Sequence, residues 1–138
     1  MKYHFVLPVI ATLLAAAAPE PTVEVATGDW SGLPDLQYRG SQHLSSKVMQ
    51  RLWELATQRK CQIPGYASGR LDMRFPFAVQ YGQDGKLSRL LVPALNCPEA
   101  EGILAGAVLN AIKTGDFARK GPSEDGWYRG DLFFVYEA

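Results

Sequence analysis

The chain has few of the residues on which most catalytic and metal sites depend. Its 138 residues include two cysteines and two histidines. His4 lies in an N-terminal apolar segment, so His43 is the other imidazole, and no cluster of His, Cys and carboxylates has metal-ligand spacing. The sequence also lacks a local motif for a Ser-His-Asp triad and a glycine-rich phosphate loop. These absences favour a non-enzymatic protein with no cofactor and no metal.

The sequence has no excess of charge of either sign. Its 14 basic and 14 acidic residues give a formal net charge of 0. Nucleic-acid-binding proteins need a basic stripe that displaces counterions from phosphates, and membrane-surface helices need a dense Lys/Arg face. We therefore expect neither nucleic acid nor a membrane surface as a partner.

A hydrophobic run long enough to span a bilayer, which takes about 20 residues, is missing as well. Lys2 precedes an apolar run over residues 5–14 and the small residues Ala15–Ala18. A basic start, a short apolar core and small residues at its end are typical of a secretory signal peptide. We expect residues 1–17 to be removed and the protein to be periplasmic. It would contact the membrane only if this segment were retained.

Export would place the two cysteines in an oxidising compartment. An even number of cysteines in a small exported domain indicates a disulfide, and Cys61 and Cys97 allow one intramolecular pairing. Cysteines so far apart do not form a C-x-x-C redox motif, so we expect a structural bond. Closing a loop of this length contributes roughly 3–4 kcal/mol to stability in the chain-entropy model.

The first part of the mature chain shows no sustained periodicity. Residues 18–44 are rich in Pro, Gly, Thr and Ser and predict an extended N-terminal segment. Apolar residues at helical spacing then predict a first helix over residues 45–60, capped by Ser45 or Ser46. The folded domain is expected to cover residues 45–138.

The clearest strand is predicted over residues 71–81, where apolar and other residues alternate without a break. Asp84-Gly85 is a strong hairpin signal, so residues 87–92 are predicted to form the returning strand. Pro76 cannot donate a ladder hydrogen bond. We expect either a bulge at Pro76 or a strand that overhangs its partners.

A second helix is predicted to begin at Pro98, with Asn96 or Cys97 as its cap, and to end near Gly115. We interpret Gly106 and the alanines of its apolar stripe as the residues that let the helix lie close to a sheet. A last strand is predicted over residues 131–137.

The predicted fold class is α+β, with the order helix-strand-strand-helix-strand. The crossover through the second helix is typical of a right-handed split βαβ unit. This topology predicts a three-stranded mixed sheet in the order 2-1-3, with both helices on one face and the last strand at an edge.

The last strand is apolar on both faces, through Leu132, Phe133, Phe134, Val135 and Tyr136. Two interpretations remain open. The second face is covered by the N-terminal segment or by Trp127, or the strand is an edge that receives a partner peptide by β-augmentation. A different function remains as an alternative: a small secreted enzyme or enzyme inhibitor that uses the carboxylates of Asp29 and Asp35.

Three segments in order carry a family resemblance: RLDMRFPFAVQYGQDGKL, NCPEAEGILAGAVLNAIKTGDF and DLFFVYE. Over residues 45–137 the layout resembles the C-terminal domain of the TonB and TolA energy transducers of the cell envelope. The positions of the cysteines are closer to TolA-type domains. The resemblance implies a non-enzymatic domain that docks onto partner proteins through its terminal sheet edge, here residues 132–136.

Members of that family carry a retained membrane anchor and a long spacer, whereas this chain has a short signal and a short lead-in. The resemblance therefore implies a stand-alone binding module of the same fold, linked to envelope transport or energy transduction.

Overall fold

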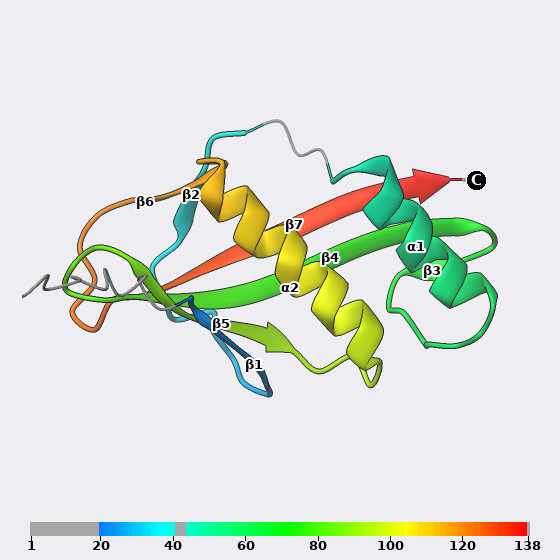
Figure 1. The fold of residues 1–138 in the computed structure, drawn as a ribbon, viewed down its shortest axis with the longest axis horizontal. Coiled ribbons are helices and arrows are strands. Elements are labelled where there is room, and N and C mark those ends of the chain that lie inside the picture. The colour runs from blue at the N-terminus through cyan, green and yellow to red at the C-terminus, as the bar shows by residue number, and fades with distance from the viewer. Residues whose placement is uncertain (1–19, 41–43, 138) are drawn as a thin grey trace, which may run out of the picture.

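The computed structural model describes residues 20–40 and 44–137. The predicted signal peptide and His43 lie outside these residues. In chain order the elements are β1 (Thr22–Ala26), β2 (Leu36–Tyr38), α1 (Ser46–Thr57), β3 (Tyr66–Ala67), β4 (Arg70–Tyr81), β5 (Leu87–Pro93), α2 (Pro98–Lys113), β6 (Phe117–Arg119) and β7 (Trp127–Glu137). Both helices lie on one face of the large sheet (Figure 1).

The fold class is α+β with two helices, but the predicted three-stranded sheet is wrong. The structure has a five-stranded mixed sheet and a second sheet formed by β2 and β6. In the large sheet β4 lies between β7 on one side and β5 and β3 on the other, and β1 adds to β5 in parallel. The additional strands contain two to five residues each, which is too short for periodicity to reveal.

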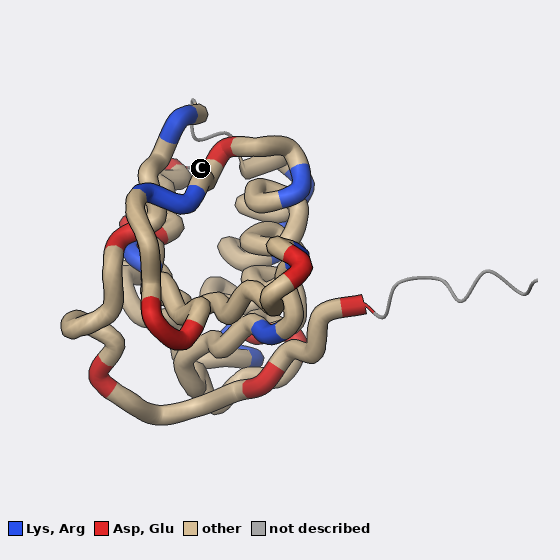
Figure 2. Tube along the Cα trace, turned by 90° about the vertical axis from the view of Figure 1, so that its left-hand side faces the viewer, with Lys and Arg blue, Asp and Glu red and all other residues tan. Residues whose placement is uncertain are grey.

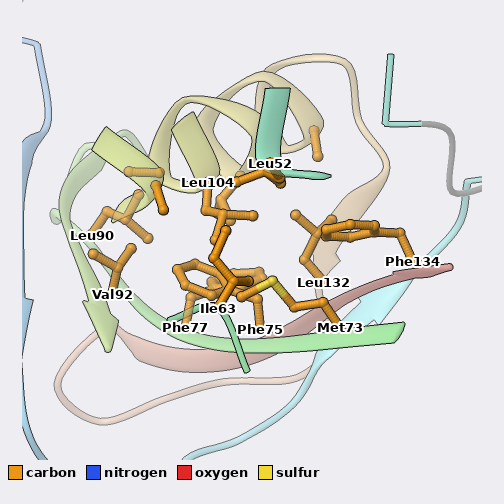
Figure 3. Packing of buried hydrophobic residues seen from close by; sticks show 14 of the residues in the cluster. Leu52, Ile63, Met73, Phe75, Phe77, Leu90, Val92, Leu104, Leu132 and Phe134 are labelled. Carbon is orange, nitrogen blue, oxygen red and sulfur yellow. The ribbon is translucent and has the colours of Figure 1, made fainter. Parts of the chain in front are cut away.

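The core lies between the sheet and the helices because the alternating residues of β4 all point to the helix side (Figure 3). Leu71, Met73, Phe75, Phe77 and Val79 are each at most 2% exposed. The paired residues of β7 share this face and add further apolar side chains to the core. The other face of β4 is exposed from Arg70 to Pro76, as the alternation predicts, whereas Ala78 on that face is buried.

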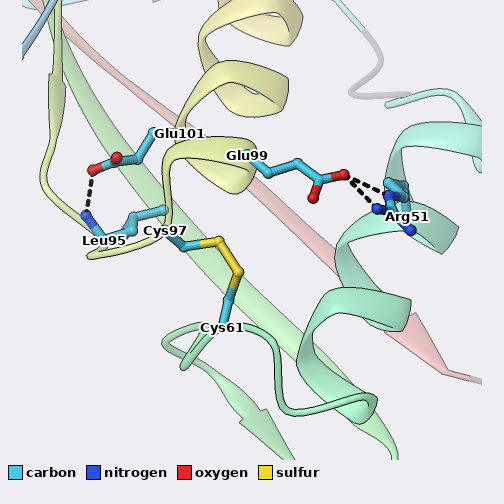
Figure 4. Close-up of a disulfide and its surroundings, with 6 residues drawn as sticks. All are labelled: Arg51, Cys61, Leu95, Cys97, Glu99 and Glu101. Atoms are coloured by element: carbon cyan, nitrogen blue, oxygen red, sulfur yellow. Dashed lines mark hydrogen bonds and ion pairs between the residues drawn. A yellow bond between two sulfur atoms is a disulfide. The ribbon is translucent and has the colours of Figure 1, made fainter.

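The helices cover this core and are joined at one end by the disulfide (Figure 4). Ser45 caps α1 by accepting a hydrogen bond from the Val48 amide. Cys97 is the N-cap residue of α2, and its Cα lies 5.6 Å from that of Cys61, just beyond the end of α1. The predicted disulfide is therefore present and connects the end of one helix to the start of the other.

Charged contacts support the same end of the helix layer. Arg51 of α1 donates to the Glu99 carboxylate of α2, with 2.8 Å between Nε and Oε1. The Glu101 carboxylate is buried and accepts a hydrogen bond from the Leu95 amide at 2.8 Å. Both acidic residues lie in the first turn of α2, where the positive pole of the helix favours negative charge.

Pro76 lies in β4 without breaking its pairing with β7, where it is opposite Asp131. The Asp72 amide donates to the Gly65 carbonyl on the side of β4 that faces away from β7. Backbone groups alternate in direction along a strand, so those of residue 76 face the same side as those of residue 72. β5 pairs with β4 only from Ala78 onward. Of the two expectations for Pro76, the overhanging strand is therefore the one found.

Within the part of the chain that the structure describes, neither helix is long and apolar enough to span a membrane. Basic and acidic residues are interspersed along the chain, as Figure 2 shows.

Candidate partner-binding edge

The edge of β7 that faces away from β4 is paired only at its beginning. The Arg129 amide donates to the Pro34 carbonyl at 2.9 Å, and Asp35 forms an isolated bridge to Arg129. The chain then leaves β7, because β2 pairs with β6 instead. Over residues 131–137, which we call the outer edge, β7 has no strand partner among the described residues.

The hydrogen bond between the Arg129 amide and the Pro34 carbonyl shows which way the backbone groups of the outer edge point. Since the Arg129 amide points away from β4, the amides and carbonyls of residues 131, 133, 135 and 137 point the same way. An unpaired row of this kind is a template for an additional strand. The outer edge can therefore accept an extended segment of another chain.

The five residues that the sequence indicated as a docking strand have different positions. Leu132 and Phe134 are 4% and 8% exposed and belong to the core, so they do not offer their side chains to a partner. Tyr136 is half-buried, and its ring packs against Trp53 at 6.2 Å between centroids. Phe133 and Val135 are 55% and 49% exposed on the opposite face of the sheet. The apolar second face of β7 is thus left uncovered at these two residues.

Ion pairs lie at both ends of the outer edge. Arg74 contacts the Asp131 carboxylate at 3.2 Å, and Arg70 contacts the Glu137 carboxylate at 3.3 Å. Arg70, Arg74 and Glu137 are largely solvent-exposed and Asp131 is partly exposed, so the pairs contribute little to stability. Their position leaves a stretch of apolar side chains between two charged ends.

A cavity of about 450 Å³ adjoins the outer edge on the helix side. Its apolar lining consists of Leu44, Val48, Ile103, Ala107, Ala111, Phe117 and Leu132. Tyr38 and Asp116 also line it, and the Tyr38 hydroxyl is buried without a hydrogen-bond partner among the described residues. Burial, with a smaller contribution from the Asp116 carboxylate, raises the pKa of Tyr38.

Gly102 and Gly106 of α2 form part of the same lining. No heavy atom lies within 4 Å of the position that a Cβ would take at either residue. Our interpretation that residue 106 lets α2 lie close to the sheet is therefore wrong, because this glycine faces open space, whereas the alanines Ala100, Ala105 and Ala111 are buried as expected. The sequence signal for the cavity is the pair of glycines one helical turn apart.

Asp29 and Asp35, the alternative catalytic pair, both have local partners. Asp29 accepts a hydrogen bond from the Ser31 amide at 3.0 Å, and its hydrogen bonds with Ser31 lower its pKa. Asp35 accepts from Arg129 Nε at 2.6 Å. Asp29 therefore stabilises a turn, and Asp35 anchors the chain that enters β2 to Arg129.

No group of three or more His, Cys, Asp or Glu residues within residues 20–40 and 44–137 has the geometry of a metal site. No family model matches this sequence, and neither a curated protein nor a solved structure shows detectable similarity to it. The outer edge and its adjoining cavity are therefore interpreted from their own geometry.

Proposed function

We propose that this chain is an exported protein-binding module that adds an extended segment of a cell-envelope protein to the outer edge of β7. The observation that carries the proposal is the unpaired row of backbone groups at residues 131–137, next to the exposed side chains of Phe133 and Val135. Main-chain hydrogen bonds would supply affinity, and alternate side chains would supply specificity.

Two features of the surroundings support this use of the edge. Natural proteins usually protect an edge strand with charged side chains, proline or a bulge, and residues 132–136, between the charged ends of the edge, contain none of these. The resemblance to the TonB and TolA C-terminal domains points to the same kind of docking, and would place the module in envelope transport or energy transduction.

A site-specific photo-crosslinker in place of Phe133 tests the proposal in the exporting cell. We expect it to capture a protein through an extended segment, which mass spectrometry of the crosslinked peptides can identify. Val25 is the matched control, since it is similarly exposed at 51% but lies on β1, at the far side of the sheet. Equal capture from both positions, or none from position 133, would contradict the proposal.

A substitution supplies the complementary measurement. Phe133→Lys should abolish capture at a crosslinker placed at Val135 while leaving the thermal unfolding curve nearly unchanged, because residue 133 lies outside the core. Retained capture by this variant would show that the exposed apolar side chains do not contribute to binding.

A further inference from the structure

We infer that the cavity beside the outer edge is a side-chain pocket, and that the partner segment fills it with an aromatic or large aliphatic residue opposite Leu132. This inference rests on the proposed function of the edge and specifies the chemistry of the partner.

The cavity lies where an additional strand would place one of its side chains. Two of the lining residues are Leu132 of β7 and Tyr38 of β2. The chain touches the outer side of β7 at Arg129 and then turns away from it, because β2 pairs with β6. A cavity lined by both residues therefore lies over the outer edge, between the strand and the helix layer. Side chains of neighbouring strands that are directly opposite each other point to the same face, so the residue opposite Leu132 would point toward the helices.

The register also favours a close contact at this position. The Leu132 backbone faces β4, because that of residue 131 faces outward. An antiparallel strand would therefore meet Leu132 in a non-hydrogen-bonded pair, in which the Cα atoms are about 4.5 Å apart and side chains pack most closely. The next residues of the partner would lie on the opposite face, beside Phe133.

The size and lining of the cavity define the class of side chain. A volume of about 450 Å³ is within the range of ligand pockets and accommodates an aromatic ring. Aliphatic side chains and the ring of Phe117 supply seven of its lining residues, and the carboxylate of Asp116 at the cavity disfavours an acidic group. The pocket therefore selects a large apolar residue.

The glycines of α2 give independent support. Glycine in the interior of a helix is less favourable than alanine, and neither Gly102 nor Gly106 has a positive φ or a close neighbour that would require it. Neither backbone conformation nor close packing requires glycine at these two positions. What they provide is open space in the wall of the cavity.

Two synthetic peptides test the inference with the protein as it is exported. The first, Lys-Thr-Val-Thr-Val-Phe-Lys, places Phe opposite Leu132, Val opposite Phe133 and Val135, and Lys opposite the two acidic ends in an antiparallel register. The second carries Ser in place of Phe. We expect the Phe peptide to bind about tenfold more tightly or better, since burial of an aromatic side chain accounts for that ratio or more.

Two variants locate the difference. Gly106→Leu should fill the cavity from α2 and remove the preference for the Phe peptide. Lys113→Leu adds the same side chain to the last turn of α2, outside the cavity, and should leave the preference intact. Equal affinities for the two peptides in the unmodified protein, or a preference that survives Gly106→Leu, would overturn the inference.

Hydrogen exchange separates this inference from the proposed function. Protection of the amides of Phe133 and Val135 by both peptides, without a preference for Phe, would leave the edge function standing and refute the pocket. If neither peptide protects these amides, the pocket and the edge function both fail.

Discussion

Alanine substitutions at two glycines should change stability in opposite directions. Gly106 lies inside α2, where a Cβ would meet no heavy atom within 4 Å. Gly130 lies in β7 opposite Phe77, where a Cβ would lie 2.5 Å from Cζ of that ring. The Phe77 side chain is 1% exposed and packs edge-on against Phe117, so it has little room to move.

The expected magnitudes follow from these environments. Gly106→Ala should stabilise the protein by about 0.5–1 kcal/mol, because alanine is the better helix former and costs less backbone entropy on folding. Gly130→Ala should destabilise it by about 1–3 kcal/mol through overpacking, although alanine is otherwise tolerated in a strand. Neither glycine has a positive φ, so backbone strain does not contribute to the difference.

Urea unfolding followed by circular dichroism measures both changes. With an m-value of about 1–3 kcal/mol/M, the midpoint for Gly106→Ala should rise by about 0.2–1 M, and that for Gly130→Ala should fall. A loss of stability in Gly106→Ala would show that α2 needs glycine for close packing, and would refute our reasoning about the cavity wall. The reasoning would also fail if Gly130→Ala were neutral.

Three other perturbations test the fold. Phe134→Lys should prevent folding, since residue 134 is 8% exposed, whereas Phe133→Lys should give a normal far-UV spectrum and melting curve; similar behaviour of the two would contradict the assigned faces of β7. Reduction of the Cys61–Cys97 disulfide should lower the free energy of unfolding by roughly 3–4 kcal/mol in urea titrations, and an unchanged midpoint would exclude a stabilising role. Hydrogen bonds from the Trp127 amide and from Ser123 lower the pKa of Asp125. Asp125→Asn should therefore reduce stability above about pH 4, and the difference from the unmodified protein should disappear as pH falls through the depressed pKa, which urea midpoints between pH 3 and 7 would show.

The parts of the fold that the sequence revealed are those with a long regular pattern. The strand predicted over residues 71–81 is β4 apart from one residue, because its alternation covers a strand with one face on the core. The start of α2 at Pro98 is as predicted, and the cap of α1 is Ser45, one of the two serines expected, since capping chemistry depends on single residues.

The strands that were missed lack such a pattern or depend on distant partners. β1 contains five residues, and its Val23 and Val25 are substantially exposed, so hydrophobic burial does not specify it. Its position depends on parallel pairing with β5, about 65 residues away in sequence. Local propensity carries little information about such a long-range contact.

The candidate site was only partly predictable for a related reason. An apolar run over residues 132–136 indicated a docking strand, but the sequence alone did not show that Leu132 and Phe134 point into the core while Phe133 and Val135 point out. That division depends on the register between β4 and β7. The cavity requires the placement of both helices and β2, which no local pattern contains.

Pro76 has a consequence for how this protein behaves in a crowded compartment. It lies in the stretch of β4 that neither β3 nor β5 covers, and its ring occupies the position from which an amide would bond to a foreign strand. Aggregation through that gap is therefore disfavoured. The outer edge of β7 has no comparable residue, and β1, at the other end of the sheet, is a second edge strand with Val23 and Val25 exposed. Pro76 therefore restricts association with other chains to these two edges. Production of this protein at high concentration should be limited by self-association there, and an added peptide that covers the outer edge should improve solubility.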